Sequence, residues 1–196
     1  MRLETERLIL RKIKKEDSKI MKDNSDILSI KNYFIEYPLK QKNFDYFVEE
    51  WIIECEKKLS YYFVLELKEI GKIIGLAGIK NIDDYNKTGE LSYWIFKKDR
   101  GKSYLMETKI KLLDFCFDEL KLRKLKSEVA TFNTGSLNLQ KKFGMKEEGI
   151  FRKENYNPYL KKYVDMKWFA LFKEDWKKIS PKLKKELKEK IKRLEK

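Results

Sequence analysis

The chain has 196 residues, a formal charge of +14 and no histidine. The lack of imidazole excludes catalytic triads and zinc sites built on histidine, and two cysteines are too few for a four-cysteine zinc site. We therefore expect no metal, and any proton transfer must depend on carboxylates, Tyr, Ser, Lys or water. Cys55 and Cys116 both fall on apolar faces of predicted helices, where we expect buried free thiols. Hydrophobic residues make up 42% of the chain, enough for one domain with a core.

The positive charge has two interpretations. It favours polyanionic partners, such as nucleic acid, an acidic membrane or a phosphorylated cofactor. The lysines are interleaved with glutamates along the whole chain, however, which is equally typical of a thermophile-like surface. No apolar run approaches the roughly 18 residues that cross a bilayer, and the charged N-terminus has no signal-peptide core. We expect a cytoplasmic protein with no membrane partner.

The first 60 residues predict one strand and two helices. Residues 7–13 alternate apolar and charged side chains, as a strand does, and residues 16–26 predict a polar helix. Pro38 interrupts the segment that follows, and Asn43 is a good N-cap for a second helix. We expect one face of that helix to pack in the core. Its apolar stripe consists of Phe44, Phe47, Val48, Trp51, Ile52 and Cys55.

Three strands are predicted next, as a meander. Residues 61–67 and 73–79 are rich in strand-forming side chains and are separated by a charged turn that contains Gly71. Residues 89–95 form the third strand. An amphipathic helix begins within residues 99–110. The apolar face of this helix consists of Met106, Ile110, Leu113 and Phe117.

The next part of the chain mixes strands and helices. A strand is predicted at residues 125–130, and a short helix at residues 136–143 ends at Gly144. Two further strands are predicted around residues 146–152 and 163–171. This order is typical of an α+β (mixed α/β) domain and not of a doubly wound sheet.

The composition changes after residue 172. We divide the chain into a domain of residues 1–172 and a basic amphipathic helical extension of residues 173–196. Ser180 is the predicted N-cap of the extension and Pro181 its first helical residue. The helix could dock on the domain, pair with another chain or contact RNA. Its apolar face consists of Leu183, Leu187, Ile191 and Leu194.

One connection has the form of a phosphate-binding loop. The segment DRGKSYLMETKI, residues 99–110, joins a predicted strand to a predicted helix. Backbone N–H groups point outward at such a junction and can bind phosphate. The loop keeps Gly101 but has Ser103 and Leu105 where small residues would let the backbone approach a ligand. It is either a phosphate-binding loop with an altered lining or only a turn.

Five motifs follow one another along the chain: LETERLILRKIKKED, GELSYWI, RGKSYLMET, FNTGSLNLQKKFGMKEEG and YVDMKWFAL. In this order they resemble the GNAT-type N-acetyltransferases, specifically the Rim-type branch that acetylates ribosomal-protein N-termini. The resemblance covers roughly residues 3–172. It implies a single mixed central sheet, flanked by helices, whose strands splay apart near the middle, with acetyl-CoA in the gap.

The resemblance also implies a role for the loop. The phosphate loop of the family has the form Arg/Gln-x-x-Gly-x-Gly/Ala. Arg100 matches its first position, while Ser103 and Leu105 depart from its small residues. Serine can supply the backbone N–H, but it costs about 1 kcal/mol or more if its position requires a positive φ. The bulk of Leu105 could crowd a pyrophosphate.

Other motifs extend the implied cofactor site. Backbone N–H groups of residues 93–96 would polarise the thioester carbonyl. Asn133 and Ser136 match an Asn-x-x-Ser element of the family, although the same residues would cap a helix in any protein. Lys141 and Lys142 are either further phosphate contacts or ordinary solvated lysines. The implied acetyl-CoA-binding residues are Tyr93, Trp94, Ile95, Phe96, Arg100, Gly101, Lys102, Ser103, Tyr104, Leu105, Asn133 and Ser136.

Direct acetyl transfer to an amine requires a base for the ammonium and an acid for the leaving thiolate. Glu90 is the first choice as the base, acting through water. Asp165 is a second acid that matches a branch pattern, and a role in strand pairing or in substrate positioning is an equal alternative for it. Ser136 resembles the residue assigned as the acid in Rim-type relatives. Tyr156 and Tyr163 are alternatives, by analogy with the tyrosine of other GNAT enzymes.

Three functions remain open from the sequence. The first is acetylation of a protein N-terminal α-amino group, with a ribosomal-protein-like acceptor near ribosomal RNA. The second is acetylation of a small amine, such as a polyamine, amino sugar or amino acid; the net charge repels a polycation unless an acidic cleft reverses the field. The third is a non-catalytic module that associates with RNA or the ribosome. We expect acceptor contacts in residues 27–41 and 152–162, and a monomer or homodimer.

Overall fold

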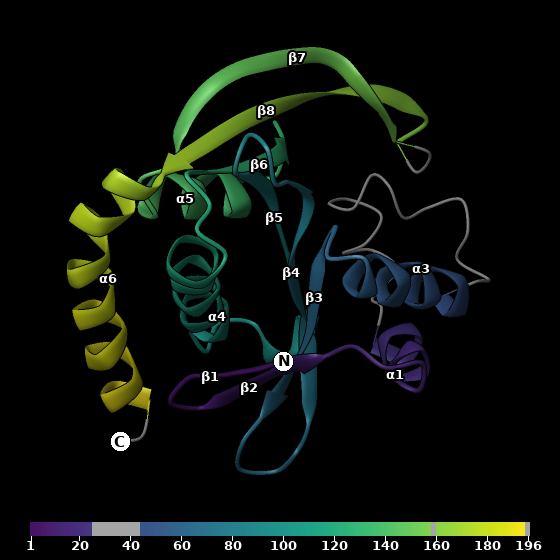
Figure 1. Cartoon of the computed structure of the whole chain (residues 1–196), viewed down its shortest axis with the longest axis vertical. Helices are drawn as coiled ribbons and strands as arrows, with labels where there is room; N and C mark the ends of the chain where they lie inside the picture. The colour runs from purple at the N-terminus through teal and green to yellow at the C-terminus, as the bar shows by residue number, and fades with distance from the viewer. Residues whose placement is uncertain (25–43, 158–159, 195–196) are drawn as a thin grey trace.

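The computed structural model describes residues 1–24, 44–157 and 160–194. One eight-stranded sheet runs through the protein in the order β1-β2-β3-β4-β5-β6-β8-β7 (Figure 1). The strands are β1 (Arg2–Glu4), β2 (Leu8–Lys12), β3 (Tyr61–Leu67), β4 (Ile73–Asp83), β5 (Thr88–Ile95), β6 (Lys124–Ala130), β7 (Lys146–Asn157) and β8 (Lys162–Phe172). The helices are α1 (Asp17–Asn24), α3 (Phe44–Glu56), α4 (Tyr104–Asp114), α5 (Thr134–Lys142) and α6 (Lys173–Leu194), with a 3-10 turn, η1 (Lys97–Asp99), before α4 and a π-helical turn, η2 (Phe115–Glu119), after it.

Helices cover both faces of the sheet. Helices α1 and α3 lie on one face, and α4 and α6 lie on the other (Figure 1). The larger apolar core fills the space between the sheet, α4 and α6, and includes Phe63, Ile110 and Phe117. A second core, which includes Val48 and Trp94, lies under α1 and α3. This arrangement confirms the predicted mixed α/β class.

The sheet splits between β5 and β6, the one parallel pair among the described strands. Pairing runs from Thr88 opposite Lys124 to Glu90 opposite Lys126 and then stops. Beyond Glu90, β5 continues toward α4, whereas β6 turns to pair with β8 along its whole length. The two strands therefore diverge, as the implied splayed sheet requires, and Glu90 lies at the vertex of the gap.

Most predicted elements are confirmed. The strand predicted at residues 61–67 coincides with β3, and it pairs antiparallel with β4 across the turn at Gly71, whose φ is +62°. The strands β4 and β7 extend beyond their predicted ends, and β1 is an additional strand. Gly144, with φ of +70°, ends α5 as predicted. The proposed cap at Asn43 lies outside the described residues.

The predicted start of the C-terminal helix is wrong. Helix α6 begins at Lys173, directly after β8, and Pro181 lies inside it, with Ser180 buried in the preceding turn. The acidic residues Glu174 and Asp175 occupy the first turn, where the helix dipole favours negative charge. Proline removes one hydrogen bond in a helix interior, which the packing of the remaining helix offsets.

The apolar face of α6 is part of the main core. Leu183, Leu187 and Ile191 are buried there, as their spacing predicts, while Leu194 is exposed. The buried face of α6 also includes Trp176, which lies before the predicted start of the helix. Its ring stacks on that of Phe143, with ring centroids 6.3 Å apart. Its indole N–H donates to Asp114 of α4 at 3.0 Å. The extension is therefore docked on the domain.

Candidate active site

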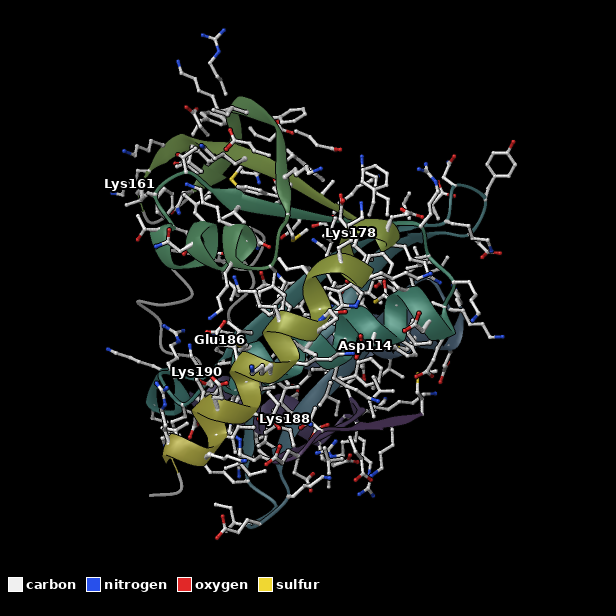
Figure 2. The ribbon with its side chains drawn as sticks, turned by 90° about the vertical axis from the view of Figure 1, so that its left-hand side faces the viewer. Asp114, Lys161, Lys178, Glu186, Lys188 and Lys190 are labelled. Carbon is white, nitrogen blue, oxygen red and sulfur yellow. The ribbon has the colours of Figure 1, made fainter. Side chains whose placement is uncertain are left out.

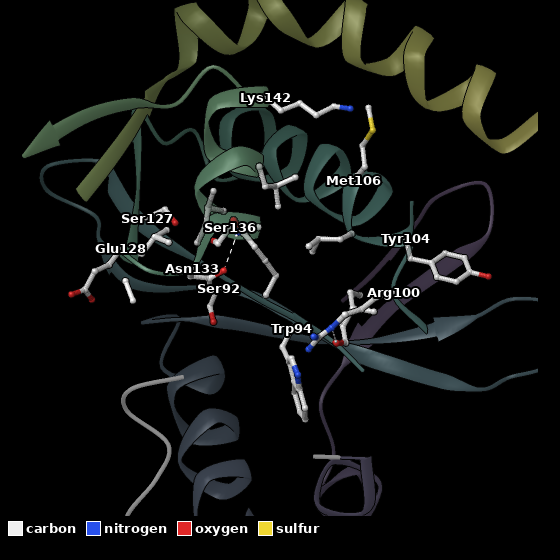
Figure 3. Close-up of a pocket in the computed structure, with 18 of the residues that line it drawn as sticks. Ser92, Trp94, Arg100, Tyr104, Met106, Ser127, Glu128, Asn133, Ser136 and Lys142 are labelled. Atoms are coloured by element: carbon white, nitrogen blue, oxygen red, sulfur yellow. Dashed lines mark hydrogen bonds between the residues drawn. The ribbon is translucent and has the colours of Figure 1, made fainter. Parts of the chain in front are cut away.

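The gap between β5 and β6 opens into a cavity of about 650 Å³. Most of its wall comes from β5, the loop before α4, the first turn of α4, β6 and α5 (Figure 3). The strands β4, β7 and β8 and helix α6 each add one residue: Lys80, Asn155, Met166 and Lys190. The sequence motifs that suggested a phosphate loop, a carboxylate base and a capped helix therefore border one space. Which atoms face this space determines the chemistry that the site can perform.

The loop before α4 presents unpaired backbone N–H groups. Gly101 has φ of +82° and Ser103 has φ of +63°, and α4 begins at Tyr104. In the described part of the chain, no acceptor receives a hydrogen bond from the N–H groups of residues 101–106. Gly101, Ser103, Tyr104, Leu105 and Met106 all line the cavity. The N-terminus of α4 thus offers its dipole and free amides to an anion.

Ser103 occupies the left-handed backbone region that the loop requires. Ser103→Gly is therefore expected to raise the free energy of unfolding by about 1 kcal/mol, since glycine adopts positive φ without steric cost. Urea unfolding of the two proteins measures the difference. Ser92→Gly, in the extended strand β5, is the matched control and is expected to lower stability. A loss of stability in Ser103→Gly would contradict the strain assigned to this residue.

A buried ion pair fixes the start of α4. Glu107 is 2% exposed and accepts hydrogen bonds from the Thr5 hydroxyl at 2.6 Å and from the Arg7 backbone N–H at 2.8 Å. The Arg7 guanidinium also donates to Glu107 and to the carbonyl oxygen of Lys102. The turn between β1 and β2 therefore holds the phosphate-loop backbone in place. Sequence reasoning missed this role, although an acidic residue beside an apolar helix stripe was a visible signal.

The basic side chains of the loop have different positions. The Arg100 Nε donates to the carbonyl oxygen of Ile95 at 3.0 Å, so this side chain folds back along the cavity wall (Figure 3). Lys102 is exposed, and it is not among the described residues that line the cavity. The Arg7 guanidinium lies 4.5 Å from the ring centroid of Tyr104. Leu105 lines the cavity and also packs against the main core.

Only some of the β5 amides face the gap. The Phe96 N–H donates to the carbonyl oxygen of Ile74 in β4 at 2.9 Å. It is therefore not available to the thioester carbonyl, contrary to what was expected from the sequence. Because antiparallel pairing alternates, the Trp94 N–H also faces β4, while those of Tyr93 and Ile95 face β6 and the gap. Two of the four expected amides thus remain as donors toward the cavity.

Glu90 lines the cavity at the vertex of the gap. It is 8% exposed, and its carboxylate lies 3.3 Å from the Lys80 ammonium and 3.1 Å from the Asn81 side-chain amide. Adjacent strand residues normally point to opposite faces, but β4 is irregular here and Asn81 has φ of +52°. This bulge lets both neighbours reach the same carboxylate and fix its orientation.

A second carboxylate, missed from the sequence, lies on the opposite wall. Glu128 of β6 lines the cavity and accepts from the Asn155 side chain at 3.2 Å. The alternative acid from the sequence, Asp165, instead accepts the Lys153 backbone N–H at 2.7 Å and thereby joins β7 to β8. Asp165 is not among the described cavity residues. The strand-pairing interpretation of Asp165 therefore has a geometric basis.

Ser136 and Asn133 meet at the start of α5. The Asn133 Oδ1 accepts the Ser136 backbone N–H at 3.1 Å, which is the expected capping bond, and both residues line the cavity (Figure 3). The Tyr93 hydroxyl lies behind them and accepts from Gln140 at 2.5 Å. Burial raises the pKa of Tyr93 to about 12, against hydrogen bonds with Gln140, Ser136 and Ser127 that lower it. Ser136 thus belongs to a chain of hydroxyl groups that includes Tyr93 and the buried Ser127.

The same chain includes a buried lysine. Lys109 of α4 is fully buried, and its ammonium lies 2.7 Å from the Gln140 side-chain oxygen and 3.4 Å from the Tyr93 hydroxyl. The ring of Phe143 lies 4.6 Å away. Desolvation lowers the pKa of Lys109 to about 7. The burial of Lys109 could not be predicted from the sequence, because the pattern of apolar and polar residues around it is that of an ordinary amphipathic helix.

The tyrosines proposed as alternative acids lie outside the cavity. Tyr163 is 62% exposed and packs on Tyr156, with ring centroids 5.2 Å apart. Neither is among the described residues that line the cavity. Of the two lysines at the end of α5, Lys142 borders the cavity, and Lys141 is exposed.

The described residues contain neither a metal-binding cluster nor a membrane-spanning helix. No group of three or more Cys, Asp or Glu side chains within these residues could hold a metal ion. Nor is any helix among them both long and apolar enough to span a bilayer.

The splayed sheet, the free amides at a helix N-terminus and the carboxylate at the vertex define a class of acyl-transfer enzyme. A family model described as "Acetyltransferase (GNAT) domain" matches residues 7–146. The chain therefore belongs to the GNAT acetyltransferase family, and it is an acetyltransferase. The family resemblance drawn from the five motifs is confirmed.

Relatives and solved structures agree with this assignment. The chain is 26% identical over 178 residues to p20 of Bacillus licheniformis, an uncharacterized N-acetyltransferase. This alignment covers 89% of the present chain and 97% of p20. A ribosomal-protein-S5-alanine acetyltransferase from Vibrio fischeri has a TM-score of 0.77 at 19% identity, covering 90% of this chain and 98% of the other. A spermidine N-acetyltransferase from Vibrio cholerae, in complex with CoA and spermine, also has a TM-score of 0.77, at 23% identity, covering 87% and 98%. These structures share the fold.

Proposed function

We propose that this enzyme transfers the acetyl group of acetyl-CoA to the α-amino group at a protein N-terminus. The observation that carries the proposal is the position of Glu90 at the vertex of the gap, at the end of a cavity that begins at the free amides of α4. Acetyl-CoA supplies an activated acetyl group as a thioester. The residues around the cavity fit its charge, because the unpaired amides at and just before the start of α4 suit a diphosphate. The cavity-lining residues that carry them are Gly101, Ser103, Tyr104, Leu105 and Met106.

The residues of the chain have separate roles in the proposed reaction. Glu90 accepts a proton from the substrate ammonium through a water molecule, leaving a neutral amine to attack the acetyl carbonyl. The N–H groups of Tyr93 and Ile95 face the gap and stabilise negative charge on the carbonyl oxygen. When the tetrahedral intermediate collapses, the C–S bond breaks and the nitrogen loses its second proton. Ser136 relays a proton to the leaving thiolate, so the products are the amide and the coenzyme A thiol, and the serine hydroxyl is restored. The Tyr93 hydroxyl, hydrogen-bonded to Ser136, supports that transfer.

The charge of the site favours an acceptor with one ammonium group. The Glu90 carboxylate is already paired with Lys80, so this end of the cavity carries little net negative charge. An N-terminal α-amino group, with a pKa near 8, is partly neutral at pH 7 and needs only modest help from a base. Such an acceptor also agrees with the ribosomal-protein acetyltransferase among the structural neighbours.

One observation favours a polyamine acceptor as the second candidate. Glu90 and Glu128 lie on opposite walls of the cavity and could bind two ammonium groups of one extended molecule. The structural neighbour bound to CoA and spermine belongs to that class. This alternative predicts that Glu128→Gln weakens the apparent affinity for the acceptor severalfold, whereas an N-terminal peptide is little affected.

A screen of acceptors tests the proposal. The enzyme, residues 1–196, is incubated with acetyl-CoA and one of three acceptors: N-terminal peptides of ribosomal proteins, spermidine or an aminoglycoside. Products are detected by mass spectrometry. Acetylation at the peptide α-amine, abolished by prior N-terminal blocking, is the expected result. Turnover of spermidine alone would establish the second candidate. Binding of acetyl-CoA without turnover of any amine would favour the non-catalytic, ribosome-associated alternative.

A further inference from the structure

Helix α6 carries a charge cluster beside the cavity that the proposed reaction does not use. The Glu186 carboxylate of α6 lies 2.5 Å from the Lys142 ammonium of α5 and 3.2 Å from the Lys190 ammonium of α6. Figure 2 shows Glu186 and Lys190 on α6. The cluster joins the appended helix to the domain and carries one net positive charge.

Both lysines border the same cavity as the phosphate loop. Lys142 and Lys190 are cavity-lining residues, together with Met106 of α4 and Leu139 of α5. Figure 3 shows Lys142 of α5 extending toward Met106 of α4, on the side of these helices that faces α6. The cluster therefore lies on the α4–α5 side of the cavity, which the loop amides also border. The two carboxylates of the cavity lie on the strands instead, Glu90 on β5 and Glu128 on β6.

The geometry leaves these ammonium groups chemically available. Each lysine has three N–H donors, and Glu186 can use only one or two from each. Hydrogen bonding to Glu186 raises the pKa of Lys190, so its ammonium stays charged at neutral pH. Both side chains are about one-third to two-fifths exposed, which allows a solvated anion to approach them.

We propose that Lys142 and Lys190 bind the 3′-phosphate of coenzyme A, so that helix α6 helps to select the donor. This inference rests on the proposed use of acetyl-CoA. The loop amides bind the diphosphate, and the lysine pair binds the additional phosphate on the ribose of the same molecule. The helix that follows the acetyltransferase domain thereby becomes part of its donor site, in addition to covering the core.

Binding of two related nucleotides tests the inference without relying on turnover. Calorimetry compares coenzyme A with 3′-dephospho-coenzyme A, which has a hydroxyl in place of the 3′-phosphate, for the wild type and for Lys190→Gln. Wild type is expected to bind coenzyme A about 10-fold more tightly than the dephospho form. Lys190→Gln is expected to weaken the binding of coenzyme A about 5-fold and to leave the binding of the dephospho form unchanged. The same result is expected for Lys142→Gln.

Lys188→Gln is the matched control. It removes one positive charge from the same helix, but Lys188 is exposed and lies two residues from Glu186, away from the cluster (Figure 2). This variant is expected to keep the 10-fold preference for coenzyme A over the dephospho form. Since both variants lose one positive charge, the comparison distinguishes a local contact with the phosphate from the long-range electrostatic field of the protein. Thermal unfolding of each variant checks that the fold is intact.

The outcomes are distinguishable. If the lysines only form ion pairs with Glu186, Lys190→Gln lowers thermal stability but keeps the wild-type preference for coenzyme A, and the inference is overturned. Equal binding of the two nucleotides by the wild type overturns it as well. Failure of the wild type to bind either nucleotide contradicts the proposed function itself.

Discussion

Glu90→Gln is expected to lower kcat about 100-fold at pH 7, with the affinity for acetyl-CoA unchanged. Glutamine keeps the size of the side chain and can still accept from Asn81, but it cannot take a proton from the substrate ammonium. The loss should shrink at pH 9, because an amine with a pKa near 8 is then largely neutral without a base. Steady-state kinetics at pH 7 and pH 9, with the acceptor found in the screen, measure both effects.

Glu128→Gln is the control for this experiment. It removes a carboxylate from the opposite wall of the same cavity, so it tests whether any local negative charge is sufficient. We expect kcat to fall less than 5-fold for a peptide acceptor. A 100-fold loss in Glu128→Gln with normal turnover in Glu90→Gln would reverse the assignment of the base.

Lys109→Met is expected to alter the pH dependence of folding. The pKa of Lys109 is about 7 in the folded protein and near 10.5 in the unfolded chain. Between these values the unfolded chain holds a proton that the folded protein lacks, so this residue makes stability rise with pH. The rise between pH 7 and pH 10 amounts to about 3 kcal/mol, and methionine, of similar volume, should remove it.

The comparison of two proteins is essential in this measurement. Burial raises the pKa values of Tyr93 and Cys116, which makes stability fall with pH in the alkaline range and partly hides the effect of Lys109. These groups are common to both proteins. Urea unfolding of wild type and Lys109→Met at pH 7 and pH 10 therefore isolates the lysine. The same change in stability for both proteins would mean that Lys109 is solvated or paired in solution.

Features set by local rules could be predicted from the sequence. Periodicity identified β3, β5 and α4, and the glycine at 144 identified the end of α5. The position of Glu90 in a strand, three residues before the gap-facing amide of Tyr93, was also readable. In each case the signal lies within a few residues of the feature, where backbone preference and side-chain alternation are decisive.

Features set by contacts between distant segments could not be predicted. Glu107 is held by Arg7, 100 residues away in the sequence. Lys109 is buried by Gln140 of α5 and by Phe143, which directly follows that helix. The start of α6 depends on the packing of Trp176 against α4 and α5, which outweighed the Ser-Pro signal at residue 180. The φ of Ser103 likewise follows from how the loop is anchored.

A crystal structure of the complex with coenzyme A is the sharpest test of phosphate binding at the start of α4. We expect diphosphate oxygens within hydrogen-bonding distance of the N–H groups between Gly101 and Met106, with the Leu105 side chain directed toward the core. A complex in which the leucine occupies that space, or in which the diphosphate lies away from the start of α4, would contradict this expectation.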